Sequence, residues 1–242
     1  YRAVPLFIQT KRLLSQKIIG EIWFAKLDWL MSSRADETRK WNWYSNKNEG
    51  GGVSGALGTH AFDILHWLIG PTKDTNGLTS TSIKERLDTS TNKYKNVSSE
   101  DVCLAQLEMK CLNTNSIVPA QVTLSSISRN GRGFWLEIYG SKGTLLLGSD
   151  NQKDYVHGFG LWHGKEGQPM QLITPDKEYL FTKTWKDGRI APVARLQDWW
   201  RESISSGKPV IPGLAEGLQS QKVCEDVIES SNSGLKISNS SP

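Results

Sequence analysis

The alternation of apolar and polar positions divides the chain into a helical beginning, a central run of strands and a helical end. A helical period from Pro5 to about Lys17 is followed by a strand-like alternation over Glu21–Met31. Further alternating runs, separated by turn residues, predict strands at Leu78–Leu87, Val102–Met109, Val118–Ile127, Phe134–Tyr139 and Thr144–Leu147. The last two amphipathic runs predict helices at Val193–Ser205 and Leu214–Asn232.

The segments between these elements are polar or rich in glycine. Arg34–Glu49 is long enough to be a functional loop, and Asp150–Pro175 is expected to be irregular apart from a short strand near Met170–Thr174. Because the strands follow one another without helices between them, the sheet should be mainly antiparallel. We therefore predict one α+β domain over residues 1–242, an open sheet with helices on one face.

The most informative stretch is Glu49–Gly70, a glycine-rich turn that leads into an amphipathic helix. At about 100° per residue, one face of this helix is apolar and the face beside it carries Ala56, His60, Asp63 and Trp67. Gly50, Gly52 and Gly55 also match a G-x-G-x-x-G dinucleotide fingerprint. We disfavour that interpretation, because the fingerprint must follow a buried strand and the residues before it are polar.

Composition and charge exclude several classes of protein. The net charge of +4 over 242 residues is spread along the chain without a basic run, so no nucleic-acid partner is expected. No apolar run reaches the length that a membrane span needs. Three cysteines without metal-ligand spacing favour reduced thiols and a cytoplasmic location, and no metal site is predicted.

The stretch Gly50–Gly70 resembles a motif of the glucose–fructose oxidoreductase/inositol dehydrogenase (Gfo/Idh/MocA) family, usually GGGxLxDxGxHxxDxxxxLxG. The beginning, Tyr1-Arg2-x-x-Pro5, the strand pair Leu136–Leu145 and the end, from Leu196 through Gly207-Lys208-Pro209, are also similar to the C-terminal domain of that family. The resemblance implies an oxidoreductase that moves hydride between NAD or NADP and a hydroxyl of a sugar, polyol or related small molecule.

The chain departs from the family pattern in two respects. The N-terminal nucleotide-binding domain should precede Tyr1 and is absent from this chain, so we expect a fragment to which NAD(P) alone does not bind tightly. Ala56 stands where the motif has an aspartate, and Gly55 replaces the usual leucine. The missing carboxylate leaves open a rival function, a non-catalytic ligand-binding, regulatory or assembly domain on the same scaffold.

His60 is the predicted catalytic residue. The positive end of a helix favours a neutral imidazole, which can accept the proton of a substrate hydroxyl. The alternative is that His60 caps backbone groups while Asp63 binds a loop.

The remaining predicted site residues come from the same motif and the loop before it. Asp63, Trp41 and Arg34 are predicted to bind substrate, and Gly51 and Gly52 to approach the cofactor. Asp63 is also compatible with a structural role, Trp41 with anchoring its loop, and Arg34 with a solvated surface position. The resemblance further implies a homo-oligomer formed through the open sheet face.

Overall fold

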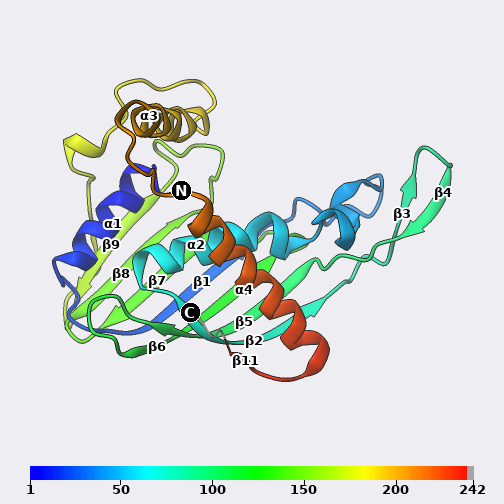
Figure 1. The fold of residues 1–242 in the computed structure, drawn as a ribbon, viewed down its shortest axis with the longest axis horizontal. Helices are drawn as coiled ribbons and strands as arrows, with labels where there is room; N and C mark the ends of the chain where they lie inside the picture. The colour runs from blue at the N-terminus through cyan, green and yellow to red at the C-terminus, as the bar shows by residue number, and fades with distance from the viewer. Residues whose placement is uncertain (239–242) are drawn as a thin grey trace.

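The fold is a nine-stranded sheet with helices on one face, seen in a computed structural model that describes residues 1–238 (Figure 1). The last four residues of the predicted domain lie outside the described part. The strands follow the order β10-β9-β8-β7-β1-β6-β5-β2-β11. Their bounds are β1 Ile22–Leu30, β2 Thr72–Ser80, β5 Val102–Lys110, β6 Ile117–Ser125, β7 Gly133–Gly140, β8 Gly143–Ser149, β9 Gly160–Lys165, β10 Gln171–Leu172 and β11 Ile237–Ser238.

Every neighbouring pair in this sheet is antiparallel except β1 and β6, which run parallel. The helices are α1 Pro5–Ser15, α2 Thr59–Leu68, α3 Ile190–Ser206 and α4 Leu214–Ser233, with single turns at η1 Trp43–Ser45, η2 Lys47–Glu49, η3 Ser54–Gly58 and η4 Lys177–Tyr179. The predicted α+β class, with a mainly antiparallel open sheet, is confirmed.

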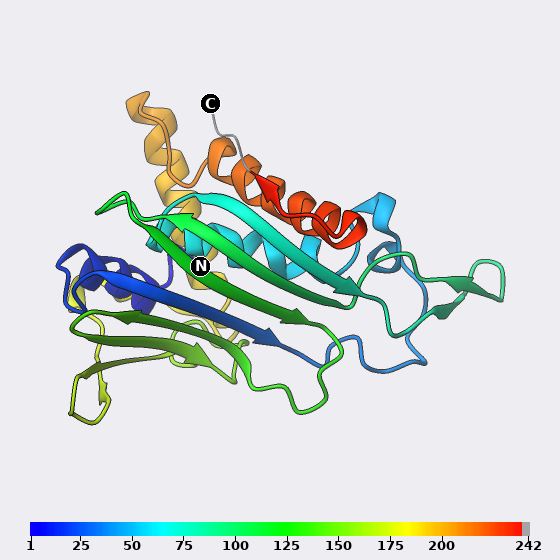
Figure 2. The same cartoon turned by 90° about the horizontal axis from the view of Figure 1, so that it is seen from below.

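The core lies between the sheet and helices α1, α2 and α4. On β5 the side chains of Cys103, Ala105, Leu107 and Met109 are buried, while Leu104 between them is 38% exposed on the other face. Period-two alternation therefore assigns one face to the core, and among residues 1–238 the helices lie on that face and not on the other (Figure 2).

The predicted strand at Leu78–Leu87 is wrong in its bounds. β2 begins at Thr72 and ends at Ser80, and the chain then leaves the sheet. The Asp101 carboxylate accepts hydrogen bonds from the backbone N–H groups of Ser82 and Ile83, at 2.8 and 3.0 Å, which replace pairing with a neighbouring strand. Residues 85–96 form a separate hairpin, the arm, from β3 (Glu85–Asp88) and β4 (Lys93–Asn96) (Figure 1).

The segment predicted to be irregular contains β9, which the prediction missed. The glycines that argued against a strand make room for large neighbours on the open face. A Cβ added at Gly160 would lie 2.2 Å from the Trp162 ring, and one at Gly164 would lie 2.3 Å from the Met170 sulfur. The short strand predicted near Met170–Thr174 is confirmed as β10.

Candidate functional site

The helix that carries His60 begins earlier than the sequence indicated. η3 is a turn of π-helix that continues into α2 without a break, so the chain is helical from Ser54 to Leu68. At the start of this helix, the Glu100 carboxylate accepts a hydrogen bond from the Ser54 backbone N–H at 2.8 Å. His60 thus lies beyond the first helical turn, and because the effect of the helix dipole fades within that turn, the dipole argument for a neutral imidazole does not hold.

His60 is nevertheless placed as a proton acceptor requires. Its side chain is exposed on one side, and the rings of Tyr1 and Trp29 lie 5.5 and 6.4 Å from the imidazole between centroids. Burial by the surrounding protein lowers the pKa of His60, and the negative charge of Asp63 opposes this shift. The ring is therefore neutral near pH 7, where it can accept a proton.

Asp63 is already bound to another side chain. Arg2 donates from Nε to one carboxylate oxygen at 2.9 Å and from Nη2 to the other at 2.6 Å. The Arg2 side chain is only 7% exposed, and its guanidinium lies 5.6 Å from the Trp67 ring centroid. Any substrate group would compete with this bidentate pair, so a substrate-binding role for Asp63 stays a prediction.

Tyr1 and Trp29, which lie beside His60, and Tyr155, which is bonded to Tyr1, were not among the predicted site residues. The Tyr1 and Tyr155 hydroxyls are hydrogen bonded at 2.8 Å, and the Trp29 indole N–H donates to Gln152 Oε1 at 2.5 Å. Trp29 occupies a core-facing position of the alternation in β1, which was a usable signal. Tyr155 lies in a polar loop whose sequence contained no such signal.

Gly51 and Gly52 are buried where the chain approaches its own backbone and side chains. A Cβ at Gly51 would lie 2.4 Å from the Tyr44 carbonyl oxygen, and one at Gly52 would lie 2.4 Å from a carboxylate oxygen of Glu100. Gly52 also has a φ of +100°, a region that favours glycine. Folding thus explains both glycines, and their proximity to a cofactor stays a prediction.

Arg34 and Trp41 lie where the polar loop meets the arm. The Arg34 guanidinium lies 4.0 Å from the Tyr44 ring centroid. The Trp41 backbone N–H donates to Leu87 O at 2.9 Å, its indole N–H donates to Asn96 O at 3.1 Å, and Lys95 lies over its ring. These contacts are those of a loop anchor, one of the two roles considered for Trp41, and substrate binding by either residue stays a prediction.

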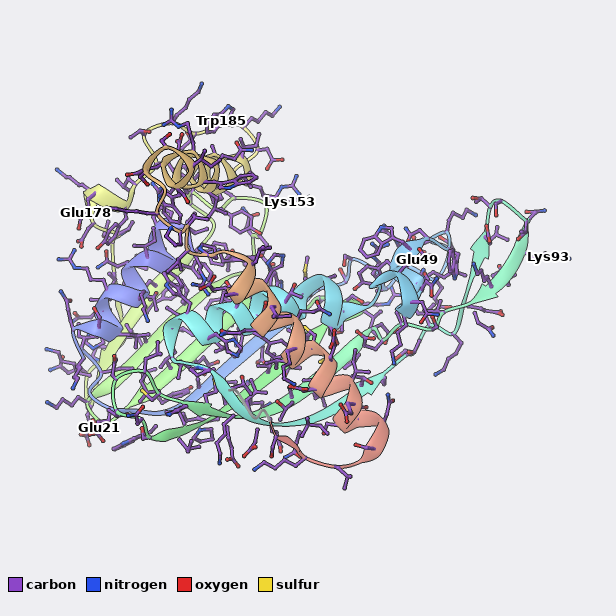
Figure 3. The ribbon with its side chains drawn as sticks, in the orientation of Figure 1. Glu21, Glu49, Lys93, Lys153, Glu178 and Trp185 are labelled. Carbon is purple, nitrogen blue, oxygen red and sulfur yellow. The ribbon has the colours of Figure 1, made fainter. Side chains whose placement is uncertain are left out.

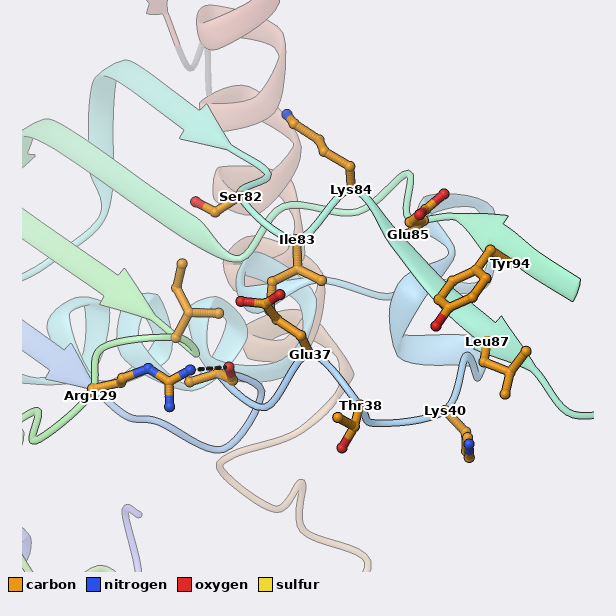
Figure 4. A pocket seen from close by; sticks show the side chains of 12 residues that line it. Glu37, Thr38, Lys40, Ser82, Ile83, Lys84, Glu85, Leu87, Tyr94 and Arg129 are labelled. Carbon is orange, nitrogen blue, oxygen red and sulfur yellow. Dashed lines mark hydrogen bonds between the residues drawn. The ribbon is translucent and has the colours of Figure 1, made fainter.

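A cavity of about 690 Å³ lies between this loop and the arm (Figure 4). Its lining carries both negative and positive side chains, namely Glu37, Glu85, Lys40, Lys84 and Arg129. Arg129 closes one side by donating to the Ala35 carbonyl at 3.0 Å. None of the twelve lining residues comes from α2, so the cavity and His60 are separate features.

No group of three His, Cys, Asp or Glu side chains in residues 1–238 is arranged to hold a metal ion. No helix in this range has the length and apolar character needed to cross a membrane.

Comparison with known proteins agrees with the fold. Residues 11–238 match the family model described as the C-terminal alpha/beta domain of an oxidoreductase family. An uncharacterized oxidoreductase of Synechocystis sp. is 45% identical over 222 residues, which cover 91% of this chain and 58% of that protein. This chain thus spans less than two thirds of that relative.

Solved structures share the fold at low identity. An oxidoreductase domain protein from Kribbella flavida matches 98% of this chain and 64% of its own, with a TM-score of 0.83 at 20% identity. Levoglucosan dehydrogenase in complex with NADH and L-sorbose matches the same shares, 98% and 64%, with a TM-score of 0.82 at 18% identity. An NAD binding oxidoreductase from Klebsiella pneumoniae matches 100% and 65%, with a TM-score of 0.82 at 17% identity.

Proposed function

Because this chain belongs to the Gfo/Idh/MocA oxidoreductase family as its C-terminal alpha/beta domain, we propose that it is the substrate domain of an NAD(P)-dependent dehydrogenase. The substrate is a sugar, polyol or related small molecule oxidised at a hydroxyl group. An upstream nucleotide-binding domain of the same polypeptide supplies most of the cofactor site. The names of two structural neighbours, one an NADH complex and one an NAD binding oxidoreductase, support this class of cofactor.

The glycine turn gives only a partial fit to such a cofactor. Gly51 and Gly52, the predicted cofactor-binding glycines, are packed against Tyr44 and Glu100, whereas a Cβ added at Gly50 would meet nothing within 4 Å. When bound, NAD(P) would accept the hydride from the substrate carbon. The part left to this chain is to take the hydroxyl proton as the carbonyl forms, and Nε2 or Nδ1 of a neutral His60 can do so.

One observation carries this proposal. His60 combines solvent exposure with a lowered pKa and lies against Tyr1, the residue at which an upstream domain would join. A histidine buried in the core or fully solvated would lack one of these properties. The site therefore offers a base that is neutral near pH 7 and accessible to a substrate.

The test is turnover by the full-length protein on a panel of sugars and polyols with NAD and with NADP. We expect turnover on at least one substrate, and His60→Ala to lower kcat by about 10²- to 10⁴-fold, the usual contribution of a general base. His60→Gln is the matched control for side-chain volume and should fail equally. Turnover that survives both changes would remove His60 from the mechanism.

The second candidate, a ligand-binding or regulatory domain, rests on Ala56. A full-length protein that binds a polyol and shows no turnover with either nucleotide would favour this candidate. Ala56→Asp then restores the carboxylate of the family motif. A gain of turnover in that variant would show that loss of the carboxylate separates the two functions.

We also propose that two copies associate through the open sheet face in the cytoplasm. Large apolar side chains gather on this face and remain exposed: Trp23 at 62%, Leu78 at 60%, Ile117 at 45% and Leu104 at 38%. Exposed apolar patches of this kind favour an isologous contact between copies. The three buried free cysteines fit a reducing compartment.

A further inference from the structure

Helix α3 has an apolar stripe that nothing in the described chain covers. Val193, Trp200 and Ile204 lie on one side of the helix and are 53%, 62% and 72% exposed. Only Ala191 and Pro192 are buried among its 17 residues. Leu214 and Leu218, at the beginning of α4, add 94% and 72% exposed side chains. Such a concentration of large apolar side chains indicates an interaction surface.

The helix that carries this stripe lies beside the N-terminus of the chain. Arg195 of α3 donates from Nη1 to the Ala3 carbonyl at 2.9 Å and from Nη2 to the Leu180 carbonyl at 2.9 Å. Figure 1 shows the N-terminus between α3 and the beginning of α4, and Figure 3 shows Trp185 and α3 projecting from the sheet at this end. A segment that entered at Tyr1 would emerge next to helix α3, on the side of Arg195.

The lengths of the relatives indicate the size of a segment that would precede Tyr1. The chain covers 58% of the Synechocystis protein and 64% of the Kribbella flavida structure, so more than a third of each lies outside the matched part. A remainder of this size is sufficient for a domain that docks through an apolar patch. The open sheet face is a different surface, since it lies across the sheet from α2 and α4.

We propose that the apolar stripe of α3, with Leu214 and Leu218, is the docking surface for the upstream nucleotide-binding domain. This assignment rests on the proposed function. Docking there orients that domain over His60, because α3 is tied to Ala3 and Tyr1 packs on the imidazole. The open sheet face is left for the second copy of the protein.

The three native cysteines of this domain are at most 2% exposed, which makes thiol labelling a direct test. Ile204→Cys and Val193→Cys place single accessible thiols on the stripe of the full-length protein. Glu202→Cys is the matched control on the other flank of the same helix, where the side chain is also exposed. Labelling of the wild-type protein gives the background.

We expect thiols at positions 204 and 193 to react at least about 10-fold more slowly than the thiol at position 202, because docked surface exchanges only on opening. The slow rate should persist on dilution, since the occupant belongs to the same polypeptide. Equal rates at all three positions would overturn the proposal. Protection lost on dilution would also overturn it, because it would assign the stripe to a second copy.

Turnover by the same preparations separates this proposal from the proposed function. Protection without turnover on any substrate leaves the docking surface standing and removes the dehydrogenase. Turnover without protection would remove the docking surface and leave the dehydrogenase standing.

Discussion

The two ends of the domain along its long axis are stabilised in different ways. Around His60, the rings of Tyr1, Phe7, Trp29, Phe134 and Phe159 pack with centroids 5.2–6.4 Å apart. At the other end, the arm is a two-stranded hairpin in which Arg86 is the only buried residue of β3 and β4. Arg86 donates to the carbonyl oxygens of Arg34 and Asp36 at 2.7 and 2.8 Å.

This difference separates the predicted site residues into two groups. Packed aromatic rings fix side-chain positions, as a proton acceptor requires, whereas an isolated hairpin is marginally stable and opens locally. His60 and Asp63 belong to the aromatic end, and Trp41 and Arg34 to the loop that is bonded to the arm. Proximity in sequence to the glycine turn did not make them one site in the structure.

The largest expected effect compares packing at the two ends. Phe134 is fully buried against Tyr1, Phe7, Trp29 and Phe159, so Phe134→Ala should lower the free energy of unfolding by about 3–5 kcal/mol. Leu87→Ala on the half-exposed arm should cost well under about 2 kcal/mol, since less apolar surface is lost. Urea unfolding of the full-length protein measures both. Equal losses would contradict the difference between the two ends.

The sequence predicted the elements with regular periodicity and missed contacts that join distant residues. The strands predicted at Phe134–Tyr139 and Thr144–Leu147, the alternation of β5 and the helix predicted at Leu214–Asn232 followed from local chemistry. β9 was hidden because its glycines accommodate Trp162 and Met170. These neighbours are known only once the strands are paired.

The site was predicted to a similar extent. The motif indicated His60, which the structure shows exposed, and the pKa of its ring is lowered by burial and not by the predicted helix dipole. The partner of Asp63 is Arg2, 61 residues away, and no spacing rule connects the two. The contacts of Trp41 with Leu87 and Asn96 likewise depend on the arm, which the predicted strand Leu78–Leu87 had placed in the sheet.

An intermediate effect tests whether the Arg2–Asp63 pair sets the protonation of His60. Arg2→Gln leaves the Asp63 carboxylate unpaired, which should raise the pKa of His60, while Asp63→Asn leaves Arg2 unpaired and should lower it. Neutral His60 is the active form in the proposed mechanism, so the acid limb of kcat/KM should move to higher pH in Arg2→Gln and to lower pH in Asp63→Asn. In the wild-type protein, the midpoint of the acid limb should lie below the ordinary histidine pKa of about 6.5.

Opposite shifts separate electrostatics from loosened structure. Loss of packing alone would move both limbs the same way or lower turnover at every pH. Lys73→Gln is the control variant, because Lys73 pairs with Asp74 and Glu108 on β2 and β5 and should leave the limb unchanged. Shifts in a common direction would show that the ion pair does not act on His60 through charge.

The smallest expected effect distinguishes the two roles of Trp41. As a loop anchor, Trp41 contributes one indole hydrogen bond to Asn96 and a cation–π contact with Lys95, so Trp41→Phe should lower stability by about 0.5–1.5 kcal/mol. The KM for substrate should stay the same, because these contacts lie on the arm and not beside His60. Trp43→Phe, on a neighbouring indole that is 52% exposed, is the matched control. If Trp41 instead stacks on a sugar ring, Trp41→Ala raises KM severalfold while Trp41→Phe largely preserves it, and the aromatic end alone would no longer account for substrate binding.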